Sequence, residues 1–225
     1  MAKKTDCEKA LRVDAERNRA RLLEAAREVF AEQGLDASMN EVARRSGVGV
    51  ATMFRRFPTK DDLITAVFAD KMKAYANAID DALADPDPWH GFRTYVERIC
   101  AMQADDRGFT DVLTVVFPAA KAFEAERDRA GAGFQELITR AKATGRLRQD
   151  FVHQDMVMIL MANAGVIAAT THAAQDTWRR LIGYLIQSFA AEVEAPLPDP
   201  PTPAQTYRAL LRLHAPKPET YPRKP

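Results

Sequence analysis

The side chains best suited to contact another molecule lie close together in residues 50–56, which read Val-Ala-Thr-Met-Phe-Arg-Arg. If this segment is helical, its exposed face carries small, hydroxyl and guanidinium groups: Ala51, Thr52, Arg55 and Arg56. Small residues permit close approach to base edges and thymine methyl groups, threonine can donate or accept, and arginine can read guanine or hold phosphate. These residue types indicate contact with double-stranded DNA.

Signals of enzyme chemistry are weak by comparison. The four histidines are dispersed along the chain, and no metalloprotease, nucleophile-elbow or phosphate-loop motif is present. Cys100 follows an apolar helical pattern with only Arg98 as a nearby cation, so a buried small residue is favoured over a redox sensor. The sequence therefore predicts no catalytic residue, no metal ligand and no cofactor.

Two short helices around a tight turn are expected to position the DNA-facing side chains. The pattern predicts helices at residues 39–45 and 50–56, separated by Ser-Gly-Val-Gly. The apolar contacts between them are expected from Val42, Val48, Met53 and Phe54. This is the geometry of a helix-turn-helix. Such hairpins also occur in proteins that never touch DNA, so a helical ligand carrier or enzyme with an incidental motif stays open as an alternative.

The rest of the folded body is predicted to be helical as well. A first helix follows the spacing of Leu22, Ala26 and Val29 and stops at Gly34. Ser38 and Glu41 form the pattern of a capping box, and Thr59 begins a weaker copy. Further helices are expected at residues 59–83, 89–103, 108–117, 118–144, 153–173 and 176–194, and Gly131 and Gly133 are expected to kink or split the fourth of these.

Charge and proline content divide the chain into four expected parts. Residues 1–60 carry a net charge of +4 and residues 61–194 a net charge of −6. Nine of the 13 prolines lie in residues 195–225, which predicts an extended tail with room for one short helix at residues 205–214. The expected parts are a flexible arm (1–14), a helix-turn-helix domain (15–63), a helical body (64–194) and a Pro-rich tail (195–225).

Composition also indicates the compartment. The two cysteines do not form a disulfide framework, and the charged N-terminal residues lack the apolar core of a signal peptide. The longest apolar run, residues 156–169, is 14 residues long, whereas a membrane span needs about 20. A cytoplasmic protein that does not enter a membrane is expected.

An ordered series of local features extends over residues 20–64. They are Phe30 and Gly34, Ser38, Val42-Ala43, Gly47-Val48, Ala51-Thr52-Met53-Phe54 and Phe57-Pro58-Thr59-Lys60-Asp61-Asp62-Leu63. In this order and spacing the segment resembles the TetR family of bacterial transcriptional regulators. The resemblance implies an all-α fold, with an N-terminal three-helix DNA-binding domain followed by a larger helical ligand-binding and dimerisation domain. It implies a repressor released from a near-palindromic operator by a small-molecule effector.

The resemblance also assigns the DNA contacts. The recognition helix is expected to use Val50, Ala51, Thr52, Arg55 and Arg56, and phosphates are expected to meet Lys60, Arg17 and Arg19. For Arg17 and Arg19, solvated surface charge is the open alternative. Two positions depart from the common pattern. Gly49 stands where many members have serine, and Phe54 stands where many have tyrosine, so two side-chain donors to phosphate are missing.

The helical body is expected to hold a homodimer interface and an effector pocket. A helix that is apolar on nearly every side must be covered all round, so residues 156–169 meet either a partner subunit or their own core. The resemblance implies the partner, through Ala162, Gly165, Ala169, Leu181, Leu185 and Phe189. A pocket is predicted from residues that are alternatively plain core: Phe92, Tyr95, Ile99, Met102, Phe117, Phe134 and Met158.

Overall fold

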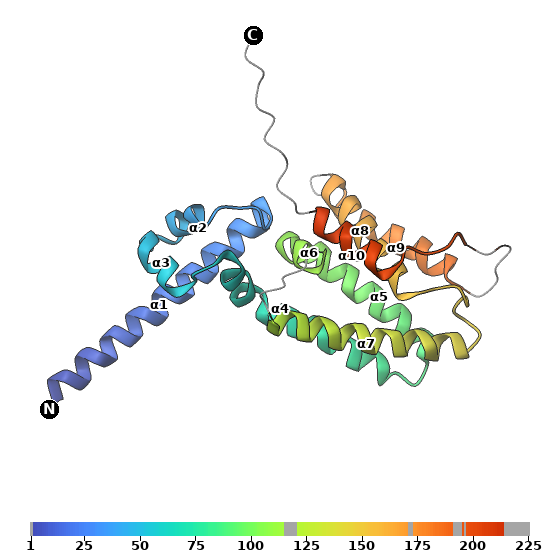
Figure 1. The fold of residues 1–225 in the computed structure, drawn as a ribbon, viewed down its shortest axis with the longest axis horizontal. Coiled ribbons are helices and arrows are strands. Elements are labelled where there is room, and N and C mark those ends of the chain that lie inside the picture. Colours follow the sequence, from blue (N-terminus) through green and yellow to red (C-terminus); the bar gives the residue numbers. More distant parts are fainter. Residues whose placement is uncertain (1, 115–120, 171–172, 191–194, 196, 214–225) are drawn as a thin grey trace, which may run out of the picture.

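The computed structural model describes residues 2–114, 121–170, 173–190, 195 and 197–213, and it is all-α over these ranges (Figure 1). The elements are α1 (Ala2–Gln33), α2 (Met39–Ser46), α3 (Val50–Arg56), α4 (Lys60–Leu83), α5 (Pro88–Asp105), α6 (Arg107–Thr114), α7 (Lys121–Ala143), α8 (His153–Thr170), α9 (Thr177–Ser188) and α10 (Pro203–Leu213). Within the same ranges, the only strand-like pairing is an isolated bridge between Leu147 and Ala190. None of these helices combines the length and apolar character that crossing a bilayer requires.

Helix α1 begins much earlier than the sequence pattern predicts. Residues 2–14 continue the helix rather than form an irregular arm, and this part of α1 projects beyond the other helices (Figure 1). The physical reason is that residues 1–33 contain neither glycine nor proline, so nothing interrupts the backbone hydrogen bonds. The predicted stop is confirmed: Gly34 adopts a φ of 75° directly after the last turn.

Caps at two helix starts fix the entry into α2 and α4. The Ser38 hydroxyl accepts from the Glu41 amide at 3.2 Å, but the Glu41 carboxylate turns to Arg44 instead of completing the box. At α4 the box is complete. The Thr59 amide donates to the Asp62 carboxylate at 3.0 Å, and the Asp62 amide donates to the Thr59 hydroxyl at 3.1 Å. Thr59 and Asp62, predicted to form the weaker capping box, therefore form the complete one, whereas Ser38 and Glu41 form only half of theirs.

The N-terminal helices pack around a small core of their own. The C-terminal half of α1 contributes Leu22 and Val29, α2 contributes Val42, and α3 contributes Met53, all at most 1% exposed. Leu63, fully buried at the start of α4, closes this core. The short recognition helix is therefore held by a single buried side chain of its own, and the rest of its surface is available for contact.

The body is built from α4 to α9, and its centre is aromatic. Phe92 stacks on Phe134 with ring centroids 5.9 Å apart, and Phe151 meets Phe92 edge-on at 5.2 Å. Helix α7 stays continuous through Gly131 and Gly133, contrary to the expected kink. A Cβ at Gly133 would lie 2.7 Å from Ile79 of α4, so this glycine permits close packing of α7 on α4 and does not break the helix.

Helix α6 joins the N-terminal helices to the body. The Leu35 amide donates to the Asp111 carboxylate at 2.9 Å, and the Arg107 guanidinium donates to the Glu32 carbonyl at 3.2 Å. In the same region, Phe68 of α4 lies between Phe30 of α1 and Phe109 of α6, with ring centroids 6.2 and 6.1 Å apart. A shift of α6 therefore acts directly on the end of α1 and on α4.

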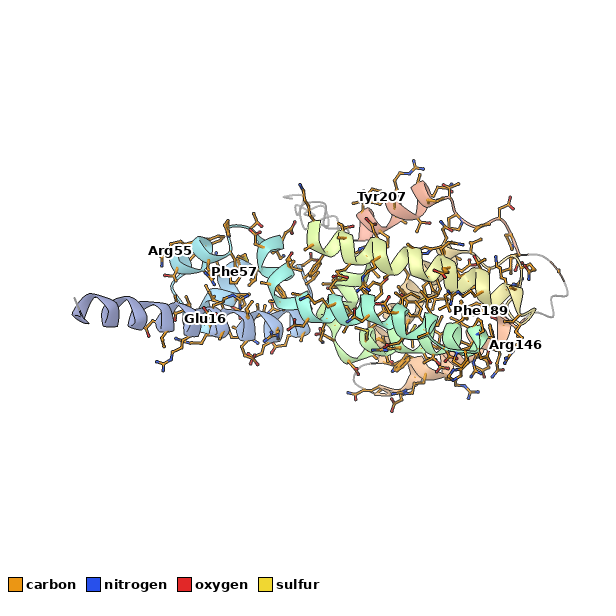
Figure 2. All side chains as sticks on the ribbon, turned by 90° about the horizontal axis from the view of Figure 1, so that it is seen from below. Glu16, Arg55, Phe57, Arg146, Phe189 and Tyr207 are labelled. Atoms are coloured by element: carbon orange, nitrogen blue, oxygen red, sulfur yellow. The ribbon has the colours of Figure 1, made fainter. Side chains whose placement is uncertain are left out.

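The C-terminal segment carries the short helix that the sequence predicted. Helix α10 lies against α8, and its outer side includes Tyr207 (Figure 2). The Thr202 amide and hydroxyl donate to the Gln205 side chain at the start of this helix. Before it, the Leu197 amide donates to the Asp150 carboxylate at 3.2 Å, which ties the tail to the body.

Candidate nucleic-acid interface and pocket

The turn between α2 and α3 orients the recognition helix. Gly47 adopts a φ of 65°, and its amide donates to the Arg44 carbonyl at 3.3 Å to close α2. The Ser46 hydroxyl donates to the Ala43 carbonyl at 3.0 Å and accepts from the Val48 amide at 3.2 Å. These short-range bonds satisfy the turn, so the entry angle of α3 is fixed before DNA is met.

Most of α3 is exposed, as the DNA interpretation requires. Ala51, Arg55 and Arg56 are exposed and Thr52 is half-buried, whereas Met53 is fully buried. Figure 2 shows Arg55 on the outer side of this end of the molecule. The prediction for Phe54 was wrong, because its side chain is 42% exposed and does not join the contacts between α2 and α3. The prediction for Met53 agrees with its burial, and Phe57, which directly follows α3, is also buried.

A hollow of about 340 Å³ lies between α1 and α3 and brings four predicted DNA-binding residues together. Arg19 comes from α1, and Thr52, Arg55 and Arg56 come from α3. Arg17 is exposed on α1 but does not line this hollow. Residues 17 and 19 are about 200° apart around a helix, so the two side chains leave α1 in nearly opposite directions.

The arginines near the turn differ in whether a carboxylate neutralises them. Arg44 pairs with Glu41 at 2.6 Å and Arg45 with Glu32 at 2.7 Å, and these hydrogen bonds hold the pKa of each glutamate below its ordinary value. Within the described residues no ion pair involves the predicted DNA-binding arginines: Arg17, Arg19, Arg55 and Arg56. Their charge stays available to an incoming polyanion.

Lys60 occupies the first position of α4, after the Thr59 cap. Its side chain is half-buried, and burial lowers the pKa of its ammonium group, while the charges of Asp36 and Asp61 act in the opposite direction. The ammonium group thus lies near a helix N-terminus, where the helix dipole also favours an anion. Its role as a phosphate contact stays a prediction.

The residues predicted to line a pocket do not gather around one cavity. Phe92, Tyr95, Ile99 and Phe134 are at most 2% exposed, and the three rings are packed against one another as core. Met158 is 46% exposed on α8, Met102 is half-buried, and Phe117 lies outside the described residues. The alternative of plain core describes the four buried residues, because their apolar surface is already covered by neighbouring helices.

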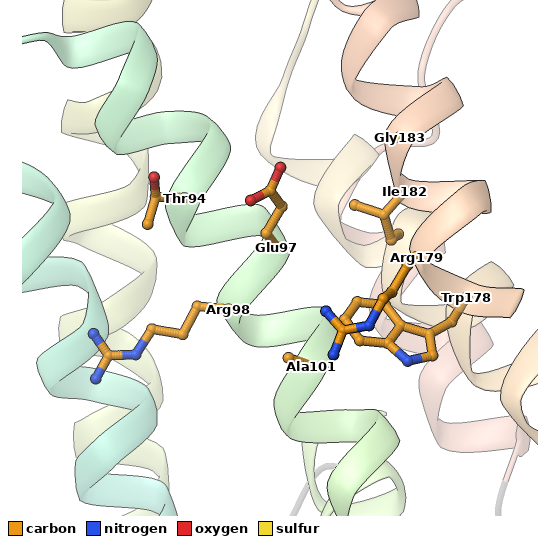
Figure 3. Close-up of a pocket in the computed structure, with 8 residues that line it drawn as sticks. All are labelled: Thr94, Glu97, Arg98, Ala101, Trp178, Arg179, Ile182 and Gly183. Atoms are coloured by element: carbon orange, nitrogen blue, oxygen red, sulfur yellow. The ribbon is translucent and has the colours of Figure 1, made fainter. Parts of the chain in front are cut away.

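A pocket of about 590 Å³ opens instead between α5 and α9 (Figure 3). Ala101, Trp178 and Ile182 supply its apolar wall, and Gly183 leaves space because nothing lies within 4 Å of the position of its Cβ. The polar rim consists of Thr94, Glu97, Arg98 and Arg179. The Arg179 guanidinium lies 4.6 Å from the Trp178 ring centroid, so a cation and an aromatic ring meet on the α9 side of the pocket. The Arg98 side chain is directed away from them (Figure 3), and its guanidinium donates to the Asp81 carboxylate of α4 at 2.6 Å. Sequence reasoning missed this pocket, because its two walls are about 80 residues apart along the chain.

One face of α8 is uncovered within a single chain. Ala162, Gly165 and Ala169 are exposed, and among the described residues nothing beyond the adjacent part of α8 lies within 4 Å of a Cβ built at Gly165. Within the described residues, therefore, α8 is not buried on every side. Leu181 and Leu185 are half-buried on α9. Phe189 was misassigned to this face: it is 9% exposed and meets Phe151 at 5.0 Å, because the chain turns inward after α9.

The opposite side of α8 holds a buried polar cluster. The Asn163 amide donates to the Gln103 side-chain oxygen at 2.9 Å and to the Cys100 carbonyl at 3.2 Å. Gln103 in turn donates to the Leu160 carbonyl at 3.3 Å. These bonds fix the register of α8 on α5. Burial raises the pKa of the Cys100 thiol to about 12, which keeps it protonated and unreactive.

Two models of known protein families match the chain, one in its N-terminal part and one in its helical body. A family model described as bacterial regulatory proteins, tetR family, matches residues 22–67. A second, described as the C-terminal domain of SbtR-like transcriptional regulators, matches residues 87–187. An HTH-type transcriptional regulator of Staphylococcus aureus is 43% identical over 54 residues, which are 24% of this chain and 29% of that protein. The chain therefore matches less than a third of the length of these relatives.

Solved structures with a similar fold cover most of the chain. The transcriptional regulator FadR from Bacillus subtilis, solved in complex with stearoyl-CoA, has a TM-score of 0.60 at 13% identity and covers 78% of this chain and 99% of its own. A tetR-family regulatory protein from Rhodococcus has a TM-score of 0.57 at 18% identity, with 78% and 98% covered. At these identities the likeness establishes the all-α fold.

Proposed function

The chain belongs to the TetR family of bacterial regulatory proteins, and on this premise we propose that it is a cytoplasmic, non-enzymatic repressor that binds its operator as a homodimer. The observation that carries the DNA-binding part is the arrangement of α1 and α3. Three arginines and one carboxylate, Asp14, line one hollow, and within the described residues none of these arginines forms an ion pair. The resulting excess of positive charge around an exposed helix suits a polyanionic partner.

The proposed binding mode follows from the exposed face of α3. This helix enters the major groove, where Thr52 and Arg55 contact base edges, while Arg56 and Arg19 approach the phosphates that flank it. Two such helices in a symmetric dimer read two half-sites about one helical turn apart. The operator is therefore near-palindromic.

The test of DNA recognition is the double variant Thr52→Ala/Arg55→Ala. Both side chains lie outside the core, so the fold should be retained, and each lost base contact should cost roughly 1–3 kcal/mol. Binding to a site selected from random duplex DNA is measured by gel shift, with circular dichroism as the control. Unchanged affinity in the variant would refute the assignment of α3. A wild-type chain that binds only non-specifically and loses binding in salt would favour the carrier.

The dimer is proposed to form through α8 and α9. The uncovered side of α8 combines small residues with the exposed Met158, and Tyr184 on α9 is 56% exposed. Met158 lies at the edge of this surface, where the segment that includes α10 begins to cover α8. A surface of small and apolar residues that the other described residues leave open is typical of a subunit interface. The small residues allow two copies of α8 to approach closely.

The pocket between α5 and α9 is the proposed effector site. Its apolar wall and charged rim fit a small, partly apolar molecule that carries a hydrogen-bonding group. Helix α5 connects the pocket to α6, because the Thr110 hydroxyl donates to the Gln103 carbonyl at 2.8 Å. Helix α6 in turn contacts the end of α1 through Asp111 and Leu35. An effector that favours another position of α5 lowers operator affinity by its differential affinity for the two states.

Blocking the pocket tests this assignment. Gly183→Leu should fill the space without a clash inside the chain, since the Cβ position is free. A panel of small molecules is screened for compounds that raise the melting temperature of the wild type and release a selected operator fragment. These compounds should lose both effects in Gly183→Leu. Compounds that act equally on the variant would place the effector elsewhere.

A further inference from the structure

The recognition helix has two chemically different flanks. Residues four apart on a helix lie within about 40° of each other, so Val50 and Phe54 share one flank of α3. Thr52 and Arg56 lie on the other flank, where they line the hollow next to α1. Ala51 and Arg55 stand between the two. One side of α3 is thus polar and cationic, and the other is apolar.

The apolar flank is uncovered. Val50 is 46% exposed and Phe54 is 42% exposed, although both belong to a helix of only seven residues. Neither side chain can donate or accept a hydrogen bond, so the flank can recognise only an apolar group. The unpaired Arg55 and Arg56 beside it make a neutral protein surface a poor match, and a polyanion a good one.

The geometry points to one apolar group. We propose that Val50 and Phe54 contact the 5-methyl groups of thymine in the major groove, and that these contacts select thymines in each half-site. Among the four bases, thymine alone presents a methyl group in the major groove. This inference rests on the proposed DNA-binding function and extends it to specificity: Thr52 and Arg55 read polar base edges, while Val50 and Phe54 read methyl groups next to them.

Uracil substitution isolates the methyl group without changing any hydrogen bond of the base pair. The full-length wild-type chain is first used to select sites from random duplex DNA. Each thymine of the selected half-site is then replaced by deoxyuridine, one at a time, and affinity is measured by fluorescence anisotropy. At one or more positions the wild type should bind roughly fourfold more weakly, the ratio expected for the burial of one methyl group.

Two variants show which side chains sense the methyl group. In Val50→Ala/Phe54→Ala the uracil effect at those positions should fall below about twofold, because the apolar surface has been removed. In Thr52→Ala, a matched truncation on the opposite flank, overall affinity should fall but the ratio between thymine and uracil should persist. Circular dichroism of both variants verifies the fold, since neither change touches a fully buried side chain.

The outcomes are distinguishable. Sites without a required thymine, a wild type indifferent to uracil at every position, or a Val50→Ala/Phe54→Ala variant as sensitive as the wild type would each overturn the methyl-reading inference and leave the DNA-binding function intact. A wild type that enriches no sequence would overturn the proposed function and this inference together.

Discussion

Replacing Gly165 with glutamate tests the proposed dimer at its most exposed point. Within the described part of a single chain the position is free, because nothing beyond the adjacent part of α8 lies within 4 Å of the added Cβ. Glycine in a helix interior costs about 0.5–1 kcal/mol relative to better helix formers, so the isolated monomer should become slightly more stable. The substitution is therefore expected to harm only a state in which something else covers α8.

The dimer should respond strongly. A carboxylate buried without a partner costs at least about 3 kcal/mol, and a symmetric interface buries two of them, or roughly 6 kcal/mol in total. Since each 1.4 kcal/mol is a factor of ten, the dissociation constant of the dimer should rise about 10⁴-fold. Operator affinity should collapse with it, because the two half-sites are no longer read by one unit.

Sedimentation velocity and circular dichroism separate the possible outcomes, with Ala132→Glu on the exposed surface of α7 as the control. The control adds the same charge away from the proposed interface and should remain dimeric. A wild-type monomer at tens of micromolar would refute the dimer. A Gly165→Glu variant that dimerises as the wild type does would move the interface elsewhere, and one that unfolds would contradict the exposure of this face.

Further predictions address phosphate contacts and acid stability. Lys60→Ala should weaken specific and non-specific DNA binding about equally and reduce the salt slope by about 0.9 per subunit; loss at one base position with an unchanged slope would contradict the phosphate role. Gly49→Ser places a hydroxyl group at the N-cap of α3, where the Cβ position is free. The added hydroxyl can donate to a phosphate, so DNA affinity measured by gel shift should rise about fivefold. An unchanged affinity would mean that the N-terminus of α3 does not contact phosphate. The hydrogen bonds from Arg148 lower the pKa of Asp150 to about 2 from an ordinary 3.8, so the stability that the ionised carboxylate contributes is present above pH 3.8 and is lost as the pH falls towards 2. Asp150→Asn should remove that part of the acid dependence from thermal unfolding curves, and an identical pH profile would refute it.

Local sequence patterns were sufficient for the elements that position the DNA contacts. Caps and glycine stops act between residues at most four apart, so the boundaries of α2, α3 and α4 were predicted to within a residue. The same locality explains the error at α1. The sequence predicted a flexible arm at residues 1–14, whereas a continuous helix requires only that neither glycine nor proline interrupts the backbone hydrogen bonds.

The sequence by itself determined the all-α class, the helix-turn-helix and the cationic residues of α3, because each depends on periodicity and residue type within a short window. Tertiary structure alone decided which apolar side chains are covered. It exposed Phe54 and buried Phe189, and it made a pocket where α5 and α9 diverge. The periodicity of a sequence predicts which face of a helix is apolar. The side chains that cover this face come from segments far apart along the chain, and their positions are set only when all the helices pack together.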